Sequence, residues 1–220
     1  MLGTATLWDS VDLGFKPTKR TWGAEVFPGS SLPNAMVQVS PVTKFHSGAG
    51  YQYEDSVIYG FTHTNKGHWN LCHIPLLPVT GTPTPGDYCS PFSHERESAA
   101  PGYYQVFLDR YGVDAQLSST LRCAFHKYTY PAGAAPAVLA DLQRSNEHVR
   151  AWDIRKEGDN VFAGWQQTGE KMYFYAVANR PVTGIEPVVE GDREVRIVRF
   201  GEGAVSYTHL RAHETDQYLV

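Results

Sequence analysis

The chain has 220 residues, of which 42% are hydrophobic and 13% aromatic, which is enough material for one large domain or two small ones around a packed core. Only 19% of the residues are charged, whereas 20 are glycines and 14 are prolines, a composition typical of short strands joined by many turns. The formal net charge of -4 argues against a nucleic-acid partner, and the absence of about 18 consecutive apolar residues argues against a membrane span.

Residues 1–31 are rich in glycine, proline, threonine and aromatic residues but have no regular period. They are predicted to form a long irregular lead-in that wraps a sheet or lines a site. The chain does not open with a signal peptide, and we expect its true start to lie upstream because Met1 runs straight into domain-like sequence.

The rest of the chain is a series of strand-like segments. Residues 36–40 alternate apolar with polar side chains, and residues 56–61 are β-branched and aromatic. Residues 71–79 contain Pro75 and Pro78, which favours an edge strand. Further strands are predicted at residues 102–108, 113–119, 121–130, 137–142, 149–156, 161–168, 171–178 and 194–198, with hairpin turns at 110–112, 158–160 and 168–170. This spacing predicts an all-β fold, a large antiparallel two-sheet sandwich with few or no helices.

Three cysteines, Cys72, Cys89 and Cys123, are too few for a disulfide scaffold and too far apart for a zinc ribbon. Buried free thiols, or one disulfide and one thiol, are both compatible with this count.

The densest polar and aromatic cluster lies at residues 60–70. A pyranose needs planar hydrogen-bonding groups for its hydroxyls and an aromatic ring for its C–H face, and Trp69 between His68 and Asn70 offers both. A loop tryptophan that closes the end of the sandwich explains the pattern equally well. His63, His68 and His73 are spaced by five residues with no acidic ligand between them, so we do not expect a metal site.

A second cluster lies at residues 90–97. Ser93 and His94 are adjacent and point apart on an extended chain, so a hydrolytic pair is not predicted. Glu95 and Glu97 share one face of a short strand and cannot easily stand on opposite sides of a glycosidic bond. A charged structural loop is the expected role of this segment, and no catalytic residue is assigned.

These segments together resemble, in order, the N-terminal domain of glycoside hydrolase family 92 over about residues 3–204. The motifs that carry the resemblance lie at residues 27–29, 36–41, 50–55, 58–64, 93–97, 100–106 and 117–122. The resemblance implies a galactose-mutarotase-like super-sandwich, followed in the full protein by an (α/α)-barrel domain. It also implies a calcium-dependent, inverting exo-α-mannosidase that acts on mannose-containing glycans and is secreted, periplasmic or at the cell surface of a bacterium.

By the same resemblance, the general acid, the general base and most calcium ligands belong to the barrel, so the chain alone is expected to be inactive and to bind no cofactor. The sandwich would contribute substrate contacts from Asn34, Ala35, His63, Trp69, His68, Asn70, His94 and Glu95. The sequence Pro-Asn-Ala-Met at residues 33–36 replaces the family's usual Pro-Phe-Gly-Met, and residues 64–70 replace a more usual loop, so a distinct leaving-group preference is expected. A non-catalytic carbohydrate-binding module is the alternative.

The last residues, 205–220, resemble the translation of a sequencing-library adapter. We therefore expect the native domain to end at Ala204 and the remainder to be a non-native tail. A genuine helical C-terminus is the alternative, because Leu210, Arg211, Ala212 and Glu214 are acceptable helix formers.

Overall fold

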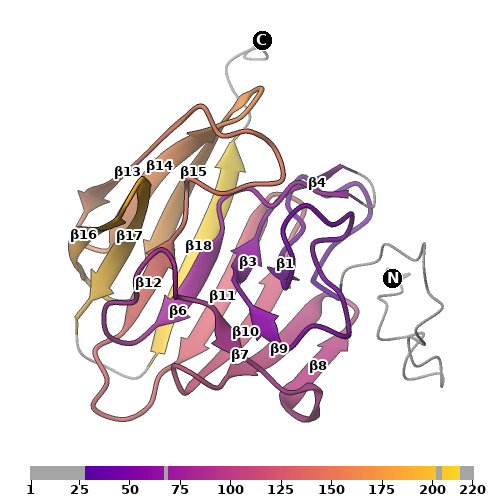
Figure 1. Cartoon of the computed structure of the whole chain (residues 1–220), viewed down its shortest axis with the longest axis horizontal. Coiled ribbons are helices and arrows are strands. Elements are labelled where there is room, and N and C mark those ends of the chain that lie inside the picture. Colours follow the sequence, from indigo (N-terminus) through magenta and orange to yellow (C-terminus); the bar gives the residue numbers. More distant parts are fainter. Residues whose placement is uncertain (1–27, 67–68, 202–204, 214–220) are drawn as a thin grey trace.

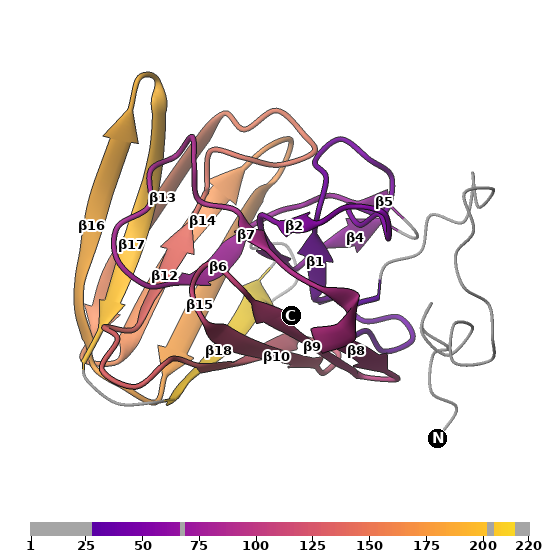
Figure 2. The same ribbon diagram turned by 60° about the horizontal axis from the view of Figure 1, so that its bottom comes forward.

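The computed structural model describes residues 28–66, 69–201 and 205–213, the last of these segments by its backbone alone. Residues 1–27 of the predicted lead-in (1–31) and the candidate residue His68 therefore lie outside the described residues. Two antiparallel sheets face each other as layers, which confirms the predicted all-β sandwich (Figures 1 and 2).

The smaller main sheet has six strands. Their order is β1 (Ser40–Val42), β3 (Gly60–Thr62), β6 (Leu76–Val79), β12 (Ala137–Ala140), β17 (Arg193–Phe200) and β16 (Val182–Glu190). The expectation of an edge strand at residues 71–79 is wrong, because β6 lies between β3 and β12. It pairs with β3 only at Leu76, however, so Pro78 has a strand neighbour on one side only, where a missing N–H is tolerated.

The larger sheet has eight strands. Their order is β13 (Ala151–Gly158), β14 (Val161–Gln167), β15 (Lys171–Ala178), β18 (Val205–His213), β11 (Cys123–Thr129), β10 (Val113–Ser119), β9 (Tyr103–Leu108) and β8 (Glu97–Ala100). Strands β9 and β10 alternate strictly between buried and half-buried side chains, which is why their sequence period predicts them so well. The three predicted hairpin turns join β9 to β10, β13 to β14 and β14 to β15.

Two minor antiparallel pairs complete the strands of the described residues. One pairs β2 (Val57–Ile58) with β7 (Ser90–Pro91), and the other is a short hairpin of β4 (Asn65–Lys66) and β5 (Trp69–Asn70). A three-residue 3-10 helix, η1 (His94–Arg96), leads into β8. No helix within the described residues has the length and hydropathy that crossing a bilayer requires.

The core lies between the two sheets and is built from both inner faces. Phe61 of the smaller sheet packs edge-on against Tyr104 and lies stacked near Tyr128 of the larger one. All three rings are fully buried. The cysteines are free thiols, so the alternative of one disulfide is wrong; Cys72 is buried, and Cys89 and Cys123 are half-buried.

Strand β18 has an unexpected position. It pairs with β15 on one side and β11 on the other, in the interior of the eight-stranded sheet (Figure 1). The helical alternative for this segment is therefore wrong. Ladder hydrogen bonds use the backbone alone, which explains how a segment without strand-like alternation joins two strands. That residues 205–220 are non-native remains a prediction.

Candidate functional site

The β4–β5 hairpin presents one large aromatic side chain on the surface. Trp69 is 54% exposed, whereas the next residue, Asn70, is 1% exposed, because successive side chains of a strand point to opposite sides. Asn70 Oδ1 accepts hydrogen bonds from Thr62 Oγ1 at 3.1 Å and from the Cys72 N–H at 2.8 Å. Asn70 therefore anchors the base of the hairpin, and Trp69 is the residue that faces outward.

A glycine makes this close packing possible. Gly50 has a φ of 72°, which L side chains rarely adopt, and a Cβ at this position would lie 2.8 Å from Asn70 Nδ2. The glycine of the motif at residues 50–55 is thus required by its contact with the hairpin.

The loop at residues 141–150 supports the hairpin from the other side. Asn146 donates from Nδ2 to the Asn70 carbonyl at 2.7 Å and accepts the His46 N–H at Oδ1 at 2.6 Å. Ser145 Oγ donates to the Leu71 carbonyl at 3.0 Å. Three segments that are distant in sequence are thus held at one end of the sandwich.

A hydroxyl, an imidazole and a carboxylate link the same loops. His73 donates from Nε2 to Glu147 Oε2 at 2.9 Å and accepts the Thr64 hydroxyl at Nδ1 at 2.7 Å. Burial lowers the pKa of His73, with Glu147 opposing the shift. A hydroxyl, an imidazole and a carboxylate in this order also occur in hydrolases, where the imidazole activates the hydroxyl as a nucleophile. Here His73 is buried and Glu147 lies at the surface, and the three groups tie the loops together.

His63, a predicted sugar contact, lies fully inside the protein. Its Nδ1–H donates to the Ile74 carbonyl at 2.9 Å, and its Nε2 lies 2.9 Å from His126 Nε2. Desolvation lowers the pKa of His63 to about 4 and that of His126 well below its ordinary value, so both rings are neutral at pH 7. Both nitrogens of His63 are occupied, and in this arrangement the ring is part of the interior of the sandwich.

His94 and Glu95 lie in η1, beside the outer strand β8. His94 stacks on the Tyr53 ring at 3.9 Å between centroids, donates from Nε2 to the Tyr53 carbonyl and contacts Glu97 Oε2 through Nδ1 at 2.5 Å. The hydrogen bond to Glu97 raises the pKa of His94 despite partial burial. Glu95 is exposed, and its N–H is capped by Ser93 Oγ.

The carboxylate that His94 contacts is buried. Glu97 accepts hydrogen bonds from the hydroxyls of Tyr104 at 2.6 Å and Tyr51 at 3.1 Å. Three sequence motifs, at residues 50–55, 93–97 and 100–106, therefore meet in one structural cluster, as expected for a charged structural loop.

Asn34 and Ala35 lie in a third place, next to the turn between β10 and β11. Asn34 has a φ of 56°, a left-handed conformation that asparagine tolerates, and its side chain is exposed. The N–H of Met36 donates to the Leu121 carbonyl at 2.8 Å, which fixes this turn beside Leu121. The structure thus brings Trp69 and Asn70 together but spreads the other described candidates over the core, η1 and this turn.

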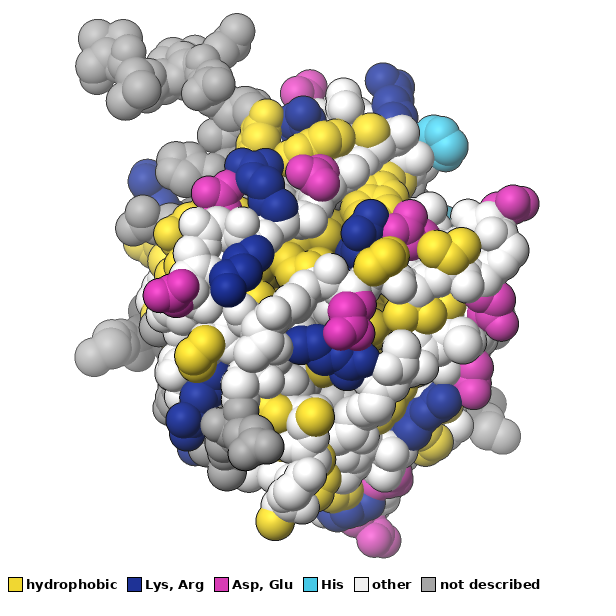
Figure 3. All heavy atoms as spheres, turned by 90° about the vertical axis from the view of Figure 1, so that its left-hand side faces the viewer, with side chains coloured by type: hydrophobic (Ala, Val, Ile, Leu, Met, Phe, Trp, Pro, Cys, Tyr) yellow, Lys and Arg dark blue, Asp and Glu magenta, His cyan; other side chains and the backbone are white. Residues whose placement is uncertain are grey.

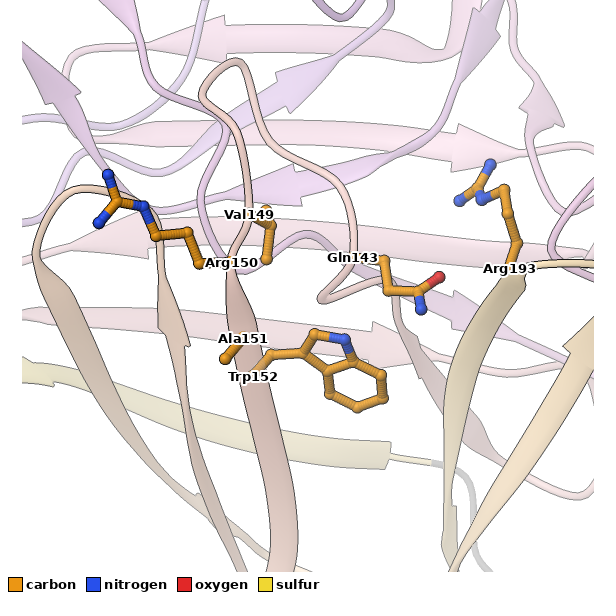
Figure 4. Close-up of a pocket in the computed structure, with 6 residues that line it drawn as sticks. All are labelled: Gln143, Val149, Arg150, Ala151, Trp152 and Arg193. Carbon is orange, nitrogen blue, oxygen red and sulfur yellow. The ribbon is translucent and has the colours of Figure 1, made fainter.

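One pocket was not foreseen from the sequence. It has a volume of about 540 Å³ and is lined by Gln143, Val149, Arg150, Ala151, Trp152 and Arg193 (Figure 4). The residues come from the loop at residues 141–150, the start of β13 and the start of β17. Trp152 lies in a segment with the pattern of an ordinary strand, so only the tertiary fold, which brings Gln143 and Arg193 beside it, reveals that it lines a pocket.

The fold defines the class of this chain, a two-sheet antiparallel β-sandwich domain. A model of the glycosyl hydrolase family 92 N-terminal domain matches residues 15–216, and the chain belongs to this family. No curated protein matches the chain significantly.

Several solved structures share the fold. The α-mannosidase BT3965 of Bacteroides thetaiotaomicron is 23% identical with a TM-score of 0.78, and the match covers 87% of this chain and 31% of that one. The family 92 hydrolase ccman5 is 24% identical with a TM-score of 0.70, with coverage of 84% and 30%. The inverting mannosidase BT2199 of the same Bacteroides is 20% identical with a TM-score of 0.72, with coverage of 87% and 29%. The chain spans about a third of the length of these proteins.

Proposed function

We propose that this chain is the N-terminal, substrate-contacting domain of an exo-acting α-mannosidase that hydrolyses mannose-containing glycans with inversion. The observation that carries the proposal is the family 92 match over residues 15–216, which is supported by the shared fold of an α-mannosidase and of an inverting mannosidase. The parent protein is proposed to be secreted, periplasmic or attached to a bacterial cell surface.

The proton-transfer groups are assigned to a further domain outside this chain, an (α/α)-barrel. An inverting glycosidase needs two carboxyl groups about 6.5–9.5 Å apart on opposite sides of the sugar. Of the two carboxylates in the most suggestive motif, Glu97 is buried among tyrosine hydroxyls and Glu95 is exposed at η1. These environments suit a structural role, so neither carboxylate is proposed as the general acid or base, and both groups are assigned to the further domain.

Calcium is assigned to the same further domain. Calcium takes six to eight oxygen ligands, including carboxylates. Within the part of the chain that the structure describes, no three His, Cys, Asp or Glu side chains gather into a possible metal site. The described residues therefore do not fit a complete calcium site.

What the chain contributes, in this proposal, is part of the sugar-binding surface. The exposed Trp69 ring offers an apolar platform for the C–H face of a pyranose, and Asn70 and Asn146 hold its hairpin in place. Asn34 and Ala35, together with Asn70, His94, Glu95 and His63, remain proposed contributors to pocket shape, with His63 acting from the interior. A leaving-group preference distinct from that of the common Phe-Gly pattern is proposed to follow from Asn34 and Ala35.

The purified chain is expected to show no turnover of an aryl α-mannoside, with or without added calcium, whereas the parent protein is expected to turn it over. Rates are measured by release of the aryl alcohol. Turnover by the chain alone, abolished by substitution of one of its own carboxylates, would contradict the proposal.

A carbohydrate-binding module without catalysis is the second candidate, and the exposure of Trp69 favours it equally. The two functions are told apart by the parent protein, which hydrolyses α-mannosides in the first case and only binds carbohydrate in the second.

In the parent, Trp69→Ala is expected to raise KM for a mannobiose about tenfold, because stacking of a sugar on an aromatic ring is lost. Trp165→Ala, at a half-buried tryptophan of β14, is the matched control and should leave KM unchanged.

A further inference from the structure

Two ion pairs of the described residues place their carboxylate wholly inside the protein. One joins Arg193 to Asp141, and the other joins His94 to Glu97. On the side of the molecule where β13, β16 and β17 lie, by contrast, basic and acidic side chains are interspersed at the surface (Figure 3). An arginine does not lose its proton in proteins, whereas a histidine does so near neutral pH. Of the two buried pairs, only that of His94 and Glu97 can therefore be switched by pH.

Both ring nitrogens of His94 face hydrogen-bond acceptors. Nδ1 lies 2.5 Å from Glu97 Oε2, and Nε2 lies 2.6 Å from the Tyr53 carbonyl oxygen. Glu97 also accepts the hydroxyls of Tyr51 and Tyr104, so it acts as an acceptor towards all three neighbours. A neutral imidazole has a single N–H, so both contacts of His94 are hydrogen bonds only when each nitrogen carries a proton and the ring is positively charged.

The surroundings of this ring favour its charged form. The hydrogen bond to Glu97 raises the pKa of His94, burial opposes this shift, and the charges of Glu97 and Glu54 add to it. Burial raises the pKa of the Tyr51 and Tyr104 hydroxyls, so both remain donors to Glu97. The titratable and charged groups around the pair are Tyr51, Tyr53, Glu54 and Asp55 of the adjacent segment, Glu95 and Arg96 of η1, Glu97 of β8 and Tyr104 of β9.

The segment that His94 contacts is a tight turn at residues 52–55. Thr43 holds its two ends, because Thr43 Oγ1 accepts the Gln52 N–H and donates to the Asp55 carboxylate, each at 2.8 Å. The Asp55 N–H closes the turn on the Gln52 carbonyl at 3.1 Å. Tyr53 lies at the tip, where its carbonyl accepts from His94 and its ring stacks on the imidazole at 3.9 Å between centroids. The tip of the turn thus depends on His94, whereas its ends depend on Thr43.

We propose that His94 is a pH-sensitive latch that fastens the turn at residues 52–55 to η1. When the ring loses one proton, the other stays on Nδ1, because the carboxylate of Glu97 is a stronger acceptor than a carbonyl. Nε2 then presents a lone pair to the Tyr53 carbonyl oxygen, so the tip of the turn moves away and water reaches Glu97. The latch is closed below the raised pKa of His94 and opens as the pH rises through it. It does not depend on the proposed mannosidase activity.

Nuclear magnetic resonance on the 220-residue chain with ¹⁵N-labelled histidine tests the latch. The midpoint of the His94 titration is expected above about 6.5, with a proton on both ring nitrogens below the midpoint and on Nδ1 alone above it. The nuclear Overhauser effect between the rings of Tyr53 and His94 is expected below the midpoint and should be lost above it.

Hydrogen exchange measures the opening of the turn. Above the midpoint the Asp55 amide is expected to exchange at least about tenfold faster relative to its intrinsic rate, because the turn loses a hydrogen bond to a charged group. The amides of β10, in the interior of the larger sheet, are the internal control and should keep their protection.

Three variants identify the cause. His94→Gln assigns the His94 signals and should make Asp55 exchange equally fast at every pH, relative to its intrinsic rate. Glu97→Gln should move the midpoint of His94 down towards about 6.5, because the carboxylate that holds the charge is removed. His148→Gln, at an exposed position, is the matched control and should leave both the midpoint and the exchange unchanged. Thermal unfolding by circular dichroism checks that each variant is folded, and the measurements on the unaltered chain stand without the variant of the buried Glu97.

Three outcomes would overturn the proposal. A midpoint of His94 at or below about 6.5 in the unaltered chain removes the charged ring. A ring contact between Tyr53 and His94 that persists above the midpoint removes the opening of the turn. A pH dependence of Asp55 exchange that His94→Gln leaves intact assigns the opening to another group.

Discussion

Three buried polar residues form a chain whose proton positions are fixed by the structure. His63 donates to a carbonyl through Nδ1, so its Nε2 accepts from His126 Nε2–H, and His126 Nδ1 in turn accepts the Tyr128 hydroxyl at 2.7 Å. Every nitrogen is used only when both rings are neutral. An added proton on His63 Nε2 would place two N–H groups against each other, and one on His126 Nδ1 would displace the hydrogen bond that the Tyr128 hydroxyl donates.

Acid is therefore expected to destabilise the fold through this chain. The pKa of His63 is lowered to about 4 and that of His126 lies lower than usual, whereas unfolded histidines titrate near 6.5. The unfolded state then binds more protons, so the free energy of unfolding falls as the pH drops from about 6.5 toward 4. Urea unfolding at pH 7.5 and pH 5 measures the change.

His94 has the opposite effect on the pH dependence of stability, so its contribution must be separated from that of His63 and His126. Its raised pKa adds stability that is present below about pH 6.5 and is lost as the pH rises through the folded value. In the His94→Gln variant, the free energy of unfolding should thus fall more between pH 7.5 and pH 5. His126→Gln should make this fall smaller, and His148→Gln, at an exposed position, should leave it unchanged. Equal stability at both pH values in the His94→Gln variant would contradict the argument.

At the scale of elements, the β4–β5 hairpin depends on the loop at residues 141–150. Asn146 joins them through bonds to the Asn70 and Ser47 carbonyls and from the His46 N–H. Asn146→Ala is expected to lower the free energy of unfolding by about 1 kcal/mol, because exposed and partly buried backbone groups lose their hydrogen-bond partner. Urea unfolding gives the energy, and faster hydrogen exchange at residues 69–72 gives the location. Asp192→Asn, in an exposed turn, should change neither.

The sequence predicts these elements unevenly, for a physical reason. The alternation of β9 and β10 is a local property of consecutive residues, so both strands and their turn follow from the pattern. Trp69 as an exposed ring is predictable from its loop. The burial of His63 is not, because it depends on His126, 63 residues away. The clamp of Asn146 on His46 and the Trp152 pocket also join distant segments that leave no periodic signal.

At the scale of the whole molecule, β18 holds together two parts of the larger sheet. Strands β13, β14 and β15 lie on one side of it, and β11, β10, β9 and β8 lie on the other. A chain that ends at Ala204 would expose the backbone edges of β11 and β15, and exposed strand edges promote association between molecules.

Removal of residues 205–220 is expected to lower the melting temperature and to cause self-association, measured by calorimetry and by light scattering. Removal of residues 214–220 alone is the control, since it keeps β18, and should preserve both properties. A monomeric chain of unchanged melting temperature after the longer deletion would show that β18 is dispensable. A loss of stability on the longer deletion is compatible with a foreign segment, because a segment of any origin can complete the sheet through its backbone hydrogen bonds.

The interior place of β18 sets the order in which this protein can be completed during synthesis. The strands on either side of β18 leave the ribosome before it does, so they cannot be joined through it until residues 205–213 have emerged. A ribosome that stalls or terminates shortly before Val205 therefore releases a half-zipped sheet, a natural target for chaperones and proteases.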